Sequence, residues 1–265
     1  MNDTEFSSLI KKLPKALFGD KIELCQWEGF RVEAGMIKGS MMFNANFKPK
    51  LNDVLLASSM KTEDVLVEEN PHFLVPTVES MDYYLPHDLY TMPSPRLFHT
   101  HLPYKVLPDS IKNSDHCKII YIARNTNDTL ISMWHFFNRV VQNVFPLEKA
   151  IQSFCNGKRR PQKILFLKYE DLKVDPKKEV EKIALFLERP FDNEEDLEKI
   201  VWRCSLERLQ NLEVNKSGSL FDHCSNSSFF RKGVIGDCKN YMTPEMEEQL
   251  DKLTNLKLLG SDLEL

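Results

Sequence analysis

Short apolar runs bounded by polar residues recur along the chain. Runs at residues 54–58, 96–101, 118–123 and 163–168 have the length and the aliphatic and aromatic content of buried β-strands. The first run, from Val54 to Ser58, contains only apolar and small residues, a pattern typical of a parallel strand that is buried on both faces. The pattern therefore predicts a central parallel sheet.

Helical patterns lie between and after these runs. We expect helices at residues 126–138, 176–189 and 193–204, and a C-terminal helix that begins at Thr243. Asp175 and Pro176 supply an N-cap and a first-turn proline for the second of these helices. Strands that alternate with helices predict an α/β fold, with helices on both faces of the sheet. Ligands in such folds bind at the carboxyl ends of the strands.

Composition narrows the class of protein further. The chain has 265 residues, of which 42% are hydrophobic and 28% charged, as expected for a globular protein with a sizeable core. No linker or low-complexity tract divides it, so we expect a single domain over residues 1–265. A net charge of -4 gives no electrostatic support for nucleic-acid binding. We find no apolar signal segment and no membrane span.

The six cysteines are scattered and form neither a C-x-x-C pair nor a ligand cluster with histidine. Reduced thiols, no metal site and a cytoplasmic location are therefore predicted. For the oligomeric state we expect a monomer or a weak homodimer.

Arg124 follows the third predicted strand, and Asp128 and Ser132 come four and eight residues later. Four-residue steps place Asp128 and Ser132 on nearly one face of the following helix. Arginine, serine and the backbone amides of the helix N-terminus together could bind a phosphate. Spacing alone is equally consistent with a surface ion pair between Arg124 and Asp128 and an exposed Ser132.

Other polar residues also follow predicted strands. His99 and His101 lie on one side of the second strand because side chains alternate, and a histidine there can act as a general base. Tyr169, just past the fourth strand, could stack on a base. Each also has an ordinary structural interpretation, as a partly buried imidazole or a packing aromatic residue.

Two further segments carry candidate binding residues. Arg231 and Lys232 precede Gly233 and could clamp an anion, although a solvated charge pair beside a turn is the commoner case. Ser205 is a possible helix cap.

Lys61 and Thr62 lie just after the first strand, where nucleotide-binding folds place a phosphate loop. Such a loop needs glycine, but Glu63 and Asp64 follow here instead.

Taken in order, these segments resemble the cytosolic sulfotransferases, and most closely their plant branch. The resemblance spans nearly the whole chain, with motifs between residues 51 and 262. The matching pieces are Met60-Lys61-Thr62, THLPY at 100–104, YIARNTNDTLISMWHF at 121–136, LKYEDLKVDP at 167–176, NLEVNKSG at 211–218 and SSFFRKG at 227–233.

The resemblance implies the sulfotransferase variant of the P-loop nucleotide-hydrolase fold, and transfer of a sulfuryl group from 3′-phosphoadenosine-5′-phosphosulfate (PAPS) to a small hydroxyl acceptor. By position, His101 corresponds to the general base and Lys61 to the lysine that stabilises the transferring sulfate. The same comparison places Thr62 beside the 5′-phosphate and assigns Tyr169 and Ser205 to the adenosine. The residues assigned to the 3′-phosphate are Arg124, Ser132, Arg231, Lys232 and Gly233. The resemblance implies no metal.

The chain departs from the family pattern in three places. The family continues after its lysine as Gly-Thr-Thr-Trp into a long helix, whereas only residues 63–70 separate Thr62 from Pro71 here. An aromatic stretch is shortened between Phe154 and Lys163, and Cys238 stands where tryptophan is usual. Three interpretations follow: a sulfotransferase with impaired activity, a degenerate member that binds nucleotide or a partner without turnover, or an incomplete gene model or splice form. A P-loop kinase is disfavoured because the Walker-A glycines are lacking.

Overall fold

Four parallel strands form the centre of the protein. The computed structural model describes residues 3–18, 22–58, 75–81, 89, 91–140, 146–148, 150, 164–221 and 224–258. The strands are arranged in the order β5-β4-β6-β7, and all three neighbouring pairs are parallel. All four had been predicted, and their bounds are β4 Asp53–Ser58, β5 Leu97–Thr100, β6 Cys117–Ala123 and β7 Ile164–Lys168. The predicted α/β fold with a parallel sheet is therefore confirmed.

The expected helices are also present, and their caps explain where they begin. Asp175 accepts a hydrogen bond from the backbone N–H of Lys178 at 3.1 Å, and Pro176 occupies the first helical turn, as the sequence predicted. Asn193 caps the next helix by accepting from the N–H of Asp196 at 3.0 Å. The four helices are α6 Thr126–Val140, α9 Pro176–Phe186, α10 Glu194–Arg203 and α13 Pro244–Leu258.

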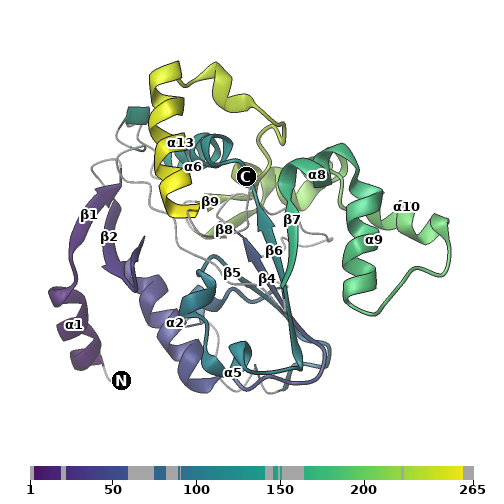
Figure 1. The fold of residues 1–265 in the computed structure, drawn as a ribbon, viewed down its shortest axis with the longest axis horizontal. Coiled ribbons are helices and arrows are strands. Elements are labelled where there is room, and N and C mark those ends of the chain that lie inside the picture. The colour runs from purple at the N-terminus through teal and green to yellow at the C-terminus, as the bar shows by residue number, and fades with distance from the viewer. Residues whose placement is uncertain are drawn as a thin grey trace.

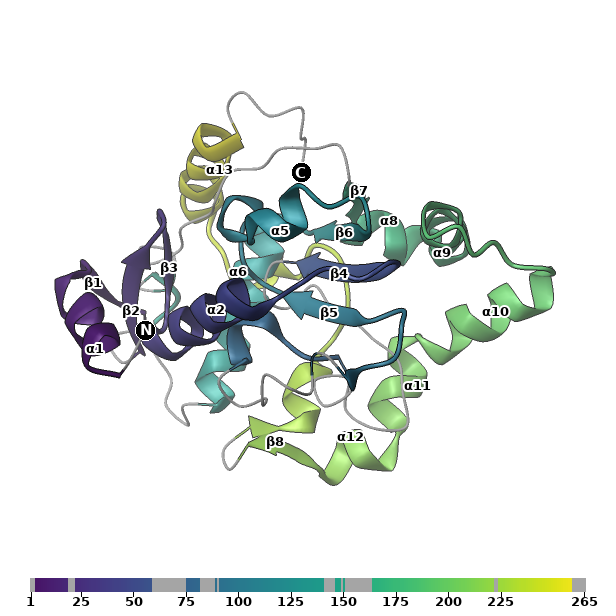
Figure 2. The same cartoon turned by 90° about the horizontal axis from the view of Figure 1, so that it is seen from below.

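Several elements were not anticipated. The N-terminal part of the chain forms α1 Asp3–Lys12 and an antiparallel sheet of β1 Lys15–Phe18, β2 Ile22–Trp27 and β3 Phe30–Val32. This unit lies at one end of the molecule, and α9 and α10 lie at the other (Figures 1 and 2). The remaining short elements are η1 Val78–Ser80, η2 Tyr104–Val106, α5 Asp109–Lys112, α8 Tyr169–Val174, α11 Leu206–Asn211, α12 Glu213–Ser217, β8 Ser219–Phe221, β9 Cys224–Ser225, η3 Asn226–Phe229 and η4 Asp237–Asn240.

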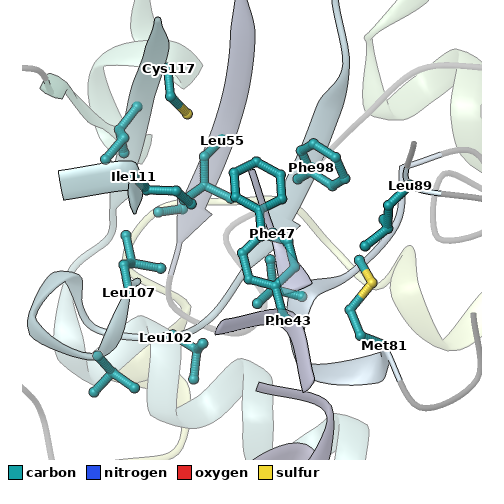
Figure 3. Close-up of a cluster of buried hydrophobic side chains, with 14 residues drawn as sticks. Phe43, Phe47, Leu55, Met81, Leu89, Phe98, Leu102, Leu107, Ile111 and Cys117 are labelled. Atoms are coloured by element: carbon teal, nitrogen blue, oxygen red, sulfur yellow. The ribbon is translucent and has the colours of Figure 1, made fainter. Parts of the chain in front are cut away.

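Helix α2, Ala34–Asn46, closes a hydrophobic core over β4 and β5 (Figure 3). The ring of Phe43 at its last turn and the ring of Phe47 just beyond it stack at 4.4 Å between centroids, and the Phe47 ring meets Phe98 of β5 edge-on at 5.2 Å. Buried aromatic side chains of this kind remove much apolar area from water, and their edge-to-face packing adds to the stability. The core therefore holds α2 and β5 together.

A buried ion pair fixes the amino-terminal ends of β4 and β5. The Nε of Arg96 donates to Oδ1 of Asp53 at 2.9 Å and Nη2 donates to Oδ2 at 2.5 Å, and both side chains are buried. The guanidinium of Arg96 also lies over the rings of Phe47 and Phe98. Arg96 precedes the strand rather than forming part of it, because β5 begins at Leu97. The pair aligns the two strands, so that their carboxyl ends also lie side by side.

Candidate active site

His101 lies immediately after β5, at the carboxyl edge of the sheet. Its Nδ1 is 3.3 Å from the carbonyl oxygen of Ser58, the last residue of the neighbouring strand β4. The rings of His99 and His101 meet at 4.5 Å between centroids in an edge-to-face contact, which agrees with the prediction that they lie on one side of the strand. Because the Ser58 carbonyl can only accept a hydrogen bond, the contact favours a proton on Nδ1 and leaves Nε2 as the basic nitrogen.

Sequence reasoning missed a buried carboxyl group beside this histidine. Glu79 in η1 accepts hydrogen bonds at Oε1 from the hydroxyl of Thr100, at 3.0 Å, and from the backbone N–H of His101. Burial raises the pKa of Glu79 to about 7, although the hydrogen bonds that it accepts act in the opposite direction. Its only sequence signal was an acidic residue directly after an apolar stretch.

Arg124 and Tyr169 follow the neighbouring strands β6 and β7 and contact each other. The guanidinium carbon of Arg124 lies 4.4 Å from the centroid of the Tyr169 ring, and both residues are buried. The Nη2 of Arg124 also donates to the backbone carbonyl of Val234 at 3.3 Å. The fold thus brings Arg124 to the segment that follows the Arg231-Lys232-Gly233 motif.

Arg124 and Asp128 do not form a surface pair, because both side chains are buried. Asp128 is buried, and its carboxylate accepts from the backbone N–H of Gly236 at 2.6 Å and of Cys238 at 2.9 Å. A carboxylate forms stronger hydrogen bonds with amides than a neutral acceptor does, so Asp128 anchors this distant segment to α6. Ser132, one turn further along the same helix, is half-buried.

The amino terminus of α6 contributes fewer amides than expected. The side-chain oxygen of Asn125 accepts from the N–H of Asn127 at 3.0 Å and of Asp128 at 3.2 Å. Asparagine is a preferred N-cap residue for this reason. Two of the amides that we expected to face a phosphate are therefore already bonded within the protein.

Arg231 and Lys232 share a carboxylate partner. Asp237 accepts from Nη1 of Arg231 at 2.5 Å, from Nζ of Lys232 at 2.9 Å and from the side-chain amide of Asn240 at 3.0 Å. Burial disfavours the ionised form of Asp237, but these hydrogen bonds outweigh it and lower the pKa to about 2. Asp237 is consequently ionised at neutral pH and holds both cations.

Gly233 is favoured by its backbone conformation, and any side chain there would also displace the side chain of Leu206. Its φ of +59° lies in the left-handed region, and a Cβ there would come within 2.3 Å of Cδ2 of Leu206. Leu206 is the first residue of α11, and Ser205 caps that helix by accepting from the N–H of Arg208 at 3.2 Å. The capping interpretation of Ser205 is therefore confirmed, and the capped end of α11 lies against the Arg231-Lys232-Gly233 motif.

Lys61 and Thr62 lie outside the described residues, as do the two shortened segments at 63–70 and 155–163. Within the described ranges, no group of three or more His, Cys, Asp or Glu side chains could hold a metal ion. The helices of these ranges also include none with the length and hydropathy needed to cross a membrane.

The comparisons with known proteins identify the class of this chain. The model of the sulfotransferase domain matches residues 50–262. The chain therefore belongs to the sulfotransferase family, and the family, the α/β fold and the PAPS-dependent sulfuryl transfer expected from the motifs are confirmed. The alternative of a binding protein without turnover is not favoured.

Individual relatives support the plant branch. Cytosolic sulfotransferase 8 of Arabidopsis thaliana is 37% identical over 310 aligned positions, which cover 98% of this chain and 93% of the relative. A crystal structure of an Arabidopsis thaliana putative steroid sulphotransferase is 26% identical, with a TM-score of 0.72, and covers 100% of this chain and 98% of that one. Retinol dehydratase, solved with androsterone and the inactive cofactor PAP, shares the fold at 19% identity, with a TM-score of 0.69 and coverage of 100% and 96%.

The alignment with cytosolic sulfotransferase 8 also shows that this chain is shorter. Since 98% of 265 residues is about 260, at least about 50 of the 310 aligned positions face a gap in this chain. The alignment covers nearly all of both proteins, so gaps of this extent lie mostly inside it. This agrees with the shortened segments inferred from the motifs.

Proposed function

We propose that this protein transfers the sulfuryl group of PAPS to a hydroxyl of a small organic acceptor, with His101 as the general base. The observation that carries the proposal is the position of His101, after β5 and beside the Ser58 carbonyl at the end of β4. A proton on Nδ1 leaves Nε2 to accept the proton of the acceptor hydroxyl.

The donor side of the proposal rests on the residues around β6. The strand order leaves β4 between β5 and β6, so His101 and Arg124 follow strands about 10 Å apart at the usual spacing between strands. That separation supports a nucleotide lying along the sheet edge. We assign the 3′-phosphate to Arg124, Ser132, Arg231, Lys232 and Gly233, the adenosine to Tyr169 and Ser205, and the 5′-phosphosulfate to Lys61 and Thr62.

In the proposed reaction, the acceptor oxygen forms a bond to sulfur as the bond from sulfur to the 5′-phosphate oxygen breaks. The hydroxyl proton passes to Nε2 of His101, and the electron pair of the broken bond leaves with adenosine 3′,5′-bisphosphate. The protein's part is to position the two substrates and to stabilise the developing charge with its cations.

The relatives support the proposed acceptor class and location. A small acceptor is supported by retinol dehydratase, which has been solved with androsterone and PAP. A cytoplasmic location is supported by the relatives named cytosolic sulfotransferases. We further infer a single domain that acts as a monomer or weak homodimer.

We also propose that turnover is impaired. A glycine loop with a helix behind it would surround the 5′-phosphate with backbone amides, but residues 63–70 contain no glycine and begin with Glu63 and Asp64. Removing one preorganised donor from an oxyanion site lowers the rate by about 10²–10³. Losing several should leave transfer barely detectable, while the 3′-phosphate residues retain some affinity for nucleotide.

Two measurements test the proposal. Calorimetric titration with adenosine 3′,5′-bisphosphate should show binding, and replacing Ser132 with alanine should weaken it less than replacing Arg124. A radiolabelled-sulfate transfer assay should show weak activity that His101→Ala abolishes and that inserting Gly-Thr-Thr-Trp and its helix after Lys61 raises by orders of magnitude. Turnover as fast as that of full-length relatives would refute the proposed impairment. Binding of the bisphosphate no tighter than that of adenosine 5′-phosphate would refute the 3′-phosphate assignment.

A further inference from the structure

Glu79 is a buried acid beside the end of β5, the strand that directly precedes His101. The residues that precede η1 pair with β5. The N–H of His99 donates to the carbonyl of Pro76 at 3.0 Å, and Thr77 pairs with His99 as a parallel bridge. This pairing places η1, and therefore Glu79, next to the last residue of β5.

The carboxyl group of Glu79 ties together the turn that follows β5. Its Oε1 accepts from the hydroxyl of Thr100 and from the N–H of His101, while the same hydroxyl accepts from the N–H of Leu102 at 3.0 Å. Three consecutive residues, with His101 in the middle, are thus held by one carboxyl group and one hydroxyl.

Burying the Glu79 carboxyl group lowers the stability of the fold, which indicates that the group serves a purpose beyond stability. Oε2 of Glu79 is buried without a well-formed hydrogen bond, and the nearby backbone N–H groups of Glu79 and Leu102 only partly offset the burial of the carboxyl group, which destabilises the folded state. Within the part of the chain that the structure describes, helix α2, which packs against η1, supplies no compensating cation. Gly39 faces η1 from α2, and Lys38, the only charged residue of α2, bonds Asp3 instead. The titratable side chains of β5 and of the residue that follows it are His99 and His101.

We propose that Glu79 is a positioning residue for His101, which rests on the proposed role of His101 as the base. By holding the backbone N–H of His101, it fixes the direction from which the ring leaves the chain. The ring then meets the Ser58 carbonyl with Nδ1, and Nε2 is the nitrogen that takes the proton. A group that acts through the backbone in this way does not contact the substrates.

Gly39 offers a way to displace Glu79 without changing it. A Cβ at Gly39 would lie 2.0 Å from the carbonyl oxygen and 2.6 Å from the carbonyl carbon of Glu79. Because both are backbone atoms, Gly39→Ala must push η1 away from α2. Gly35 is in the same helix and has no neighbour within 4 Å of its Cβ position, so Gly35→Ala is a matched control for the effect of alanine on the helix.

The test reads the imidazole directly. Nitrogen NMR of protein labelled in histidine distinguishes the two neutral tautomers of His101, and it needs no turnover. We expect a single tautomer with the proton on Nδ1 in the unmodified protein and in Gly35→Ala. Both tautomers should be populated in Glu79→Leu and Gly39→Ala. Glu79→Gln keeps an acceptor oxygen, and we expect it to restore the single tautomer.

Turnover gives a second readout, measured by radiolabelled-sulfate transfer at an enzyme concentration high enough to quantify the weak activity of the unmodified protein. Misplacement of a catalytic group by about 1 Å can cost 10²-fold, so we expect Glu79→Leu to lower kcat by about 10²-fold with the KM for the donor unchanged. A single Nδ1–H tautomer in both Glu79→Leu and Gly39→Ala would overturn the proposal, and so would equal losses in Gly35→Ala and Gly39→Ala.

Titration with adenosine 3′,5′-bisphosphate separates this proposal from the proposed function. Variants that bind the bisphosphate as the unmodified protein does have kept their fold and donor site. If the unmodified protein bound no bisphosphate, the proposed donor site would fail, and the tautomer measurement would still decide whether Glu79 positions His101. Gly39→Ala keeps the test decisive if Glu79→Leu does not fold, because it leaves the carboxyl group in the protein.

Discussion

Replacing Asp128 with asparagine should weaken nucleotide binding although Asp128 is not assigned to the nucleotide. Its carboxylate holds the amides of Gly236 and Cys238 at 2.6 and 2.9 Å, and the same segment carries the carbonyl that receives Arg124. Asparagine can keep one of the two bonds through its oxygen. Its NH₂ group then faces the other amide N–H, and two donors cannot bond to each other.

The magnitude follows from the number of bonds lost. One hydrogen bond to a charged group contributes about 1.5–3 kcal/mol to stability. The segment that is released includes the residues next to the two cations of the proposed 3′-phosphate site. We therefore expect Asp128→Asn to weaken binding of adenosine 3′,5′-bisphosphate by up to about 10- to 150-fold, the same free energy expressed as an affinity.

Calorimetric titration measures this change, and a neighbouring contact provides the control. Asn127 donates to Asp251 of α13 at 3.0 Å, which joins α6 to α13 away from the Arg231-Lys232-Gly233 motif. Asp251 is exposed, so Asp251→Asn should change the affinity by less than about 0.5 kcal/mol. Equal affinities of Asp128→Asn and the unmodified protein would refute the idea that this carboxylate organises the site.

Three further predictions follow from other contacts. Arg124→Ala should weaken bisphosphate binding by about 1.5–3 kcal/mol in calorimetry, the range for hydrogen bonds to a charged group; no change would remove it from the site. Gly233→Ala should lower the melting temperature and the bisphosphate affinity more than Gly236→Ala, because both have positive φ but only Gly233 meets a neighbour, Leu206. The raised pKa of Glu79, about 7, means that the folded state binds a proton more tightly than the unfolded state. Stability in urea should therefore fall as the pH rises from about 4.5 to 7, by a contribution on the order of 3 kcal/mol that Glu79→Gln lacks; parallel pH profiles would contradict this.

The central sheet could be predicted because its strands are nearly uniformly apolar. β4 and β6 are buried on both faces, and that burial requires runs such as the one in Cys117–Ala123. The N-terminal sheet lacks this signal. β1 and β2 have one buried residue each and β3 is three residues long, so their pairing depends on contacts with α1 and α2 that local sequence does not reveal.

The carboxyl-edge residues could be found because each follows its strand directly, whereas the partners that hold them could not. Asp128 was considered with Arg124, four residues away, but its hydrogen bonds lead to amides 108 and 110 residues further along. Glu79 bonds Thr100 and His101 across 21 and 22 residues. Spacing rules describe neighbours on one helix or strand, and these bonds join separate elements that only the fold brings together.

The pairing of Arg231 and Lys232 changes how their contribution to binding should be assessed. Counting cations in the motif suggests a full charge-assisted gain for each one that meets a phosphate. Both are already bonded to Asp237, whose low pKa keeps it ionised at neutral pH. A phosphate that takes these cations replaces one anion with another and also approaches the Asp237 carboxylate. The net gain from these two cations is therefore the difference between two similar interactions, and it is smaller than a count of cations suggests.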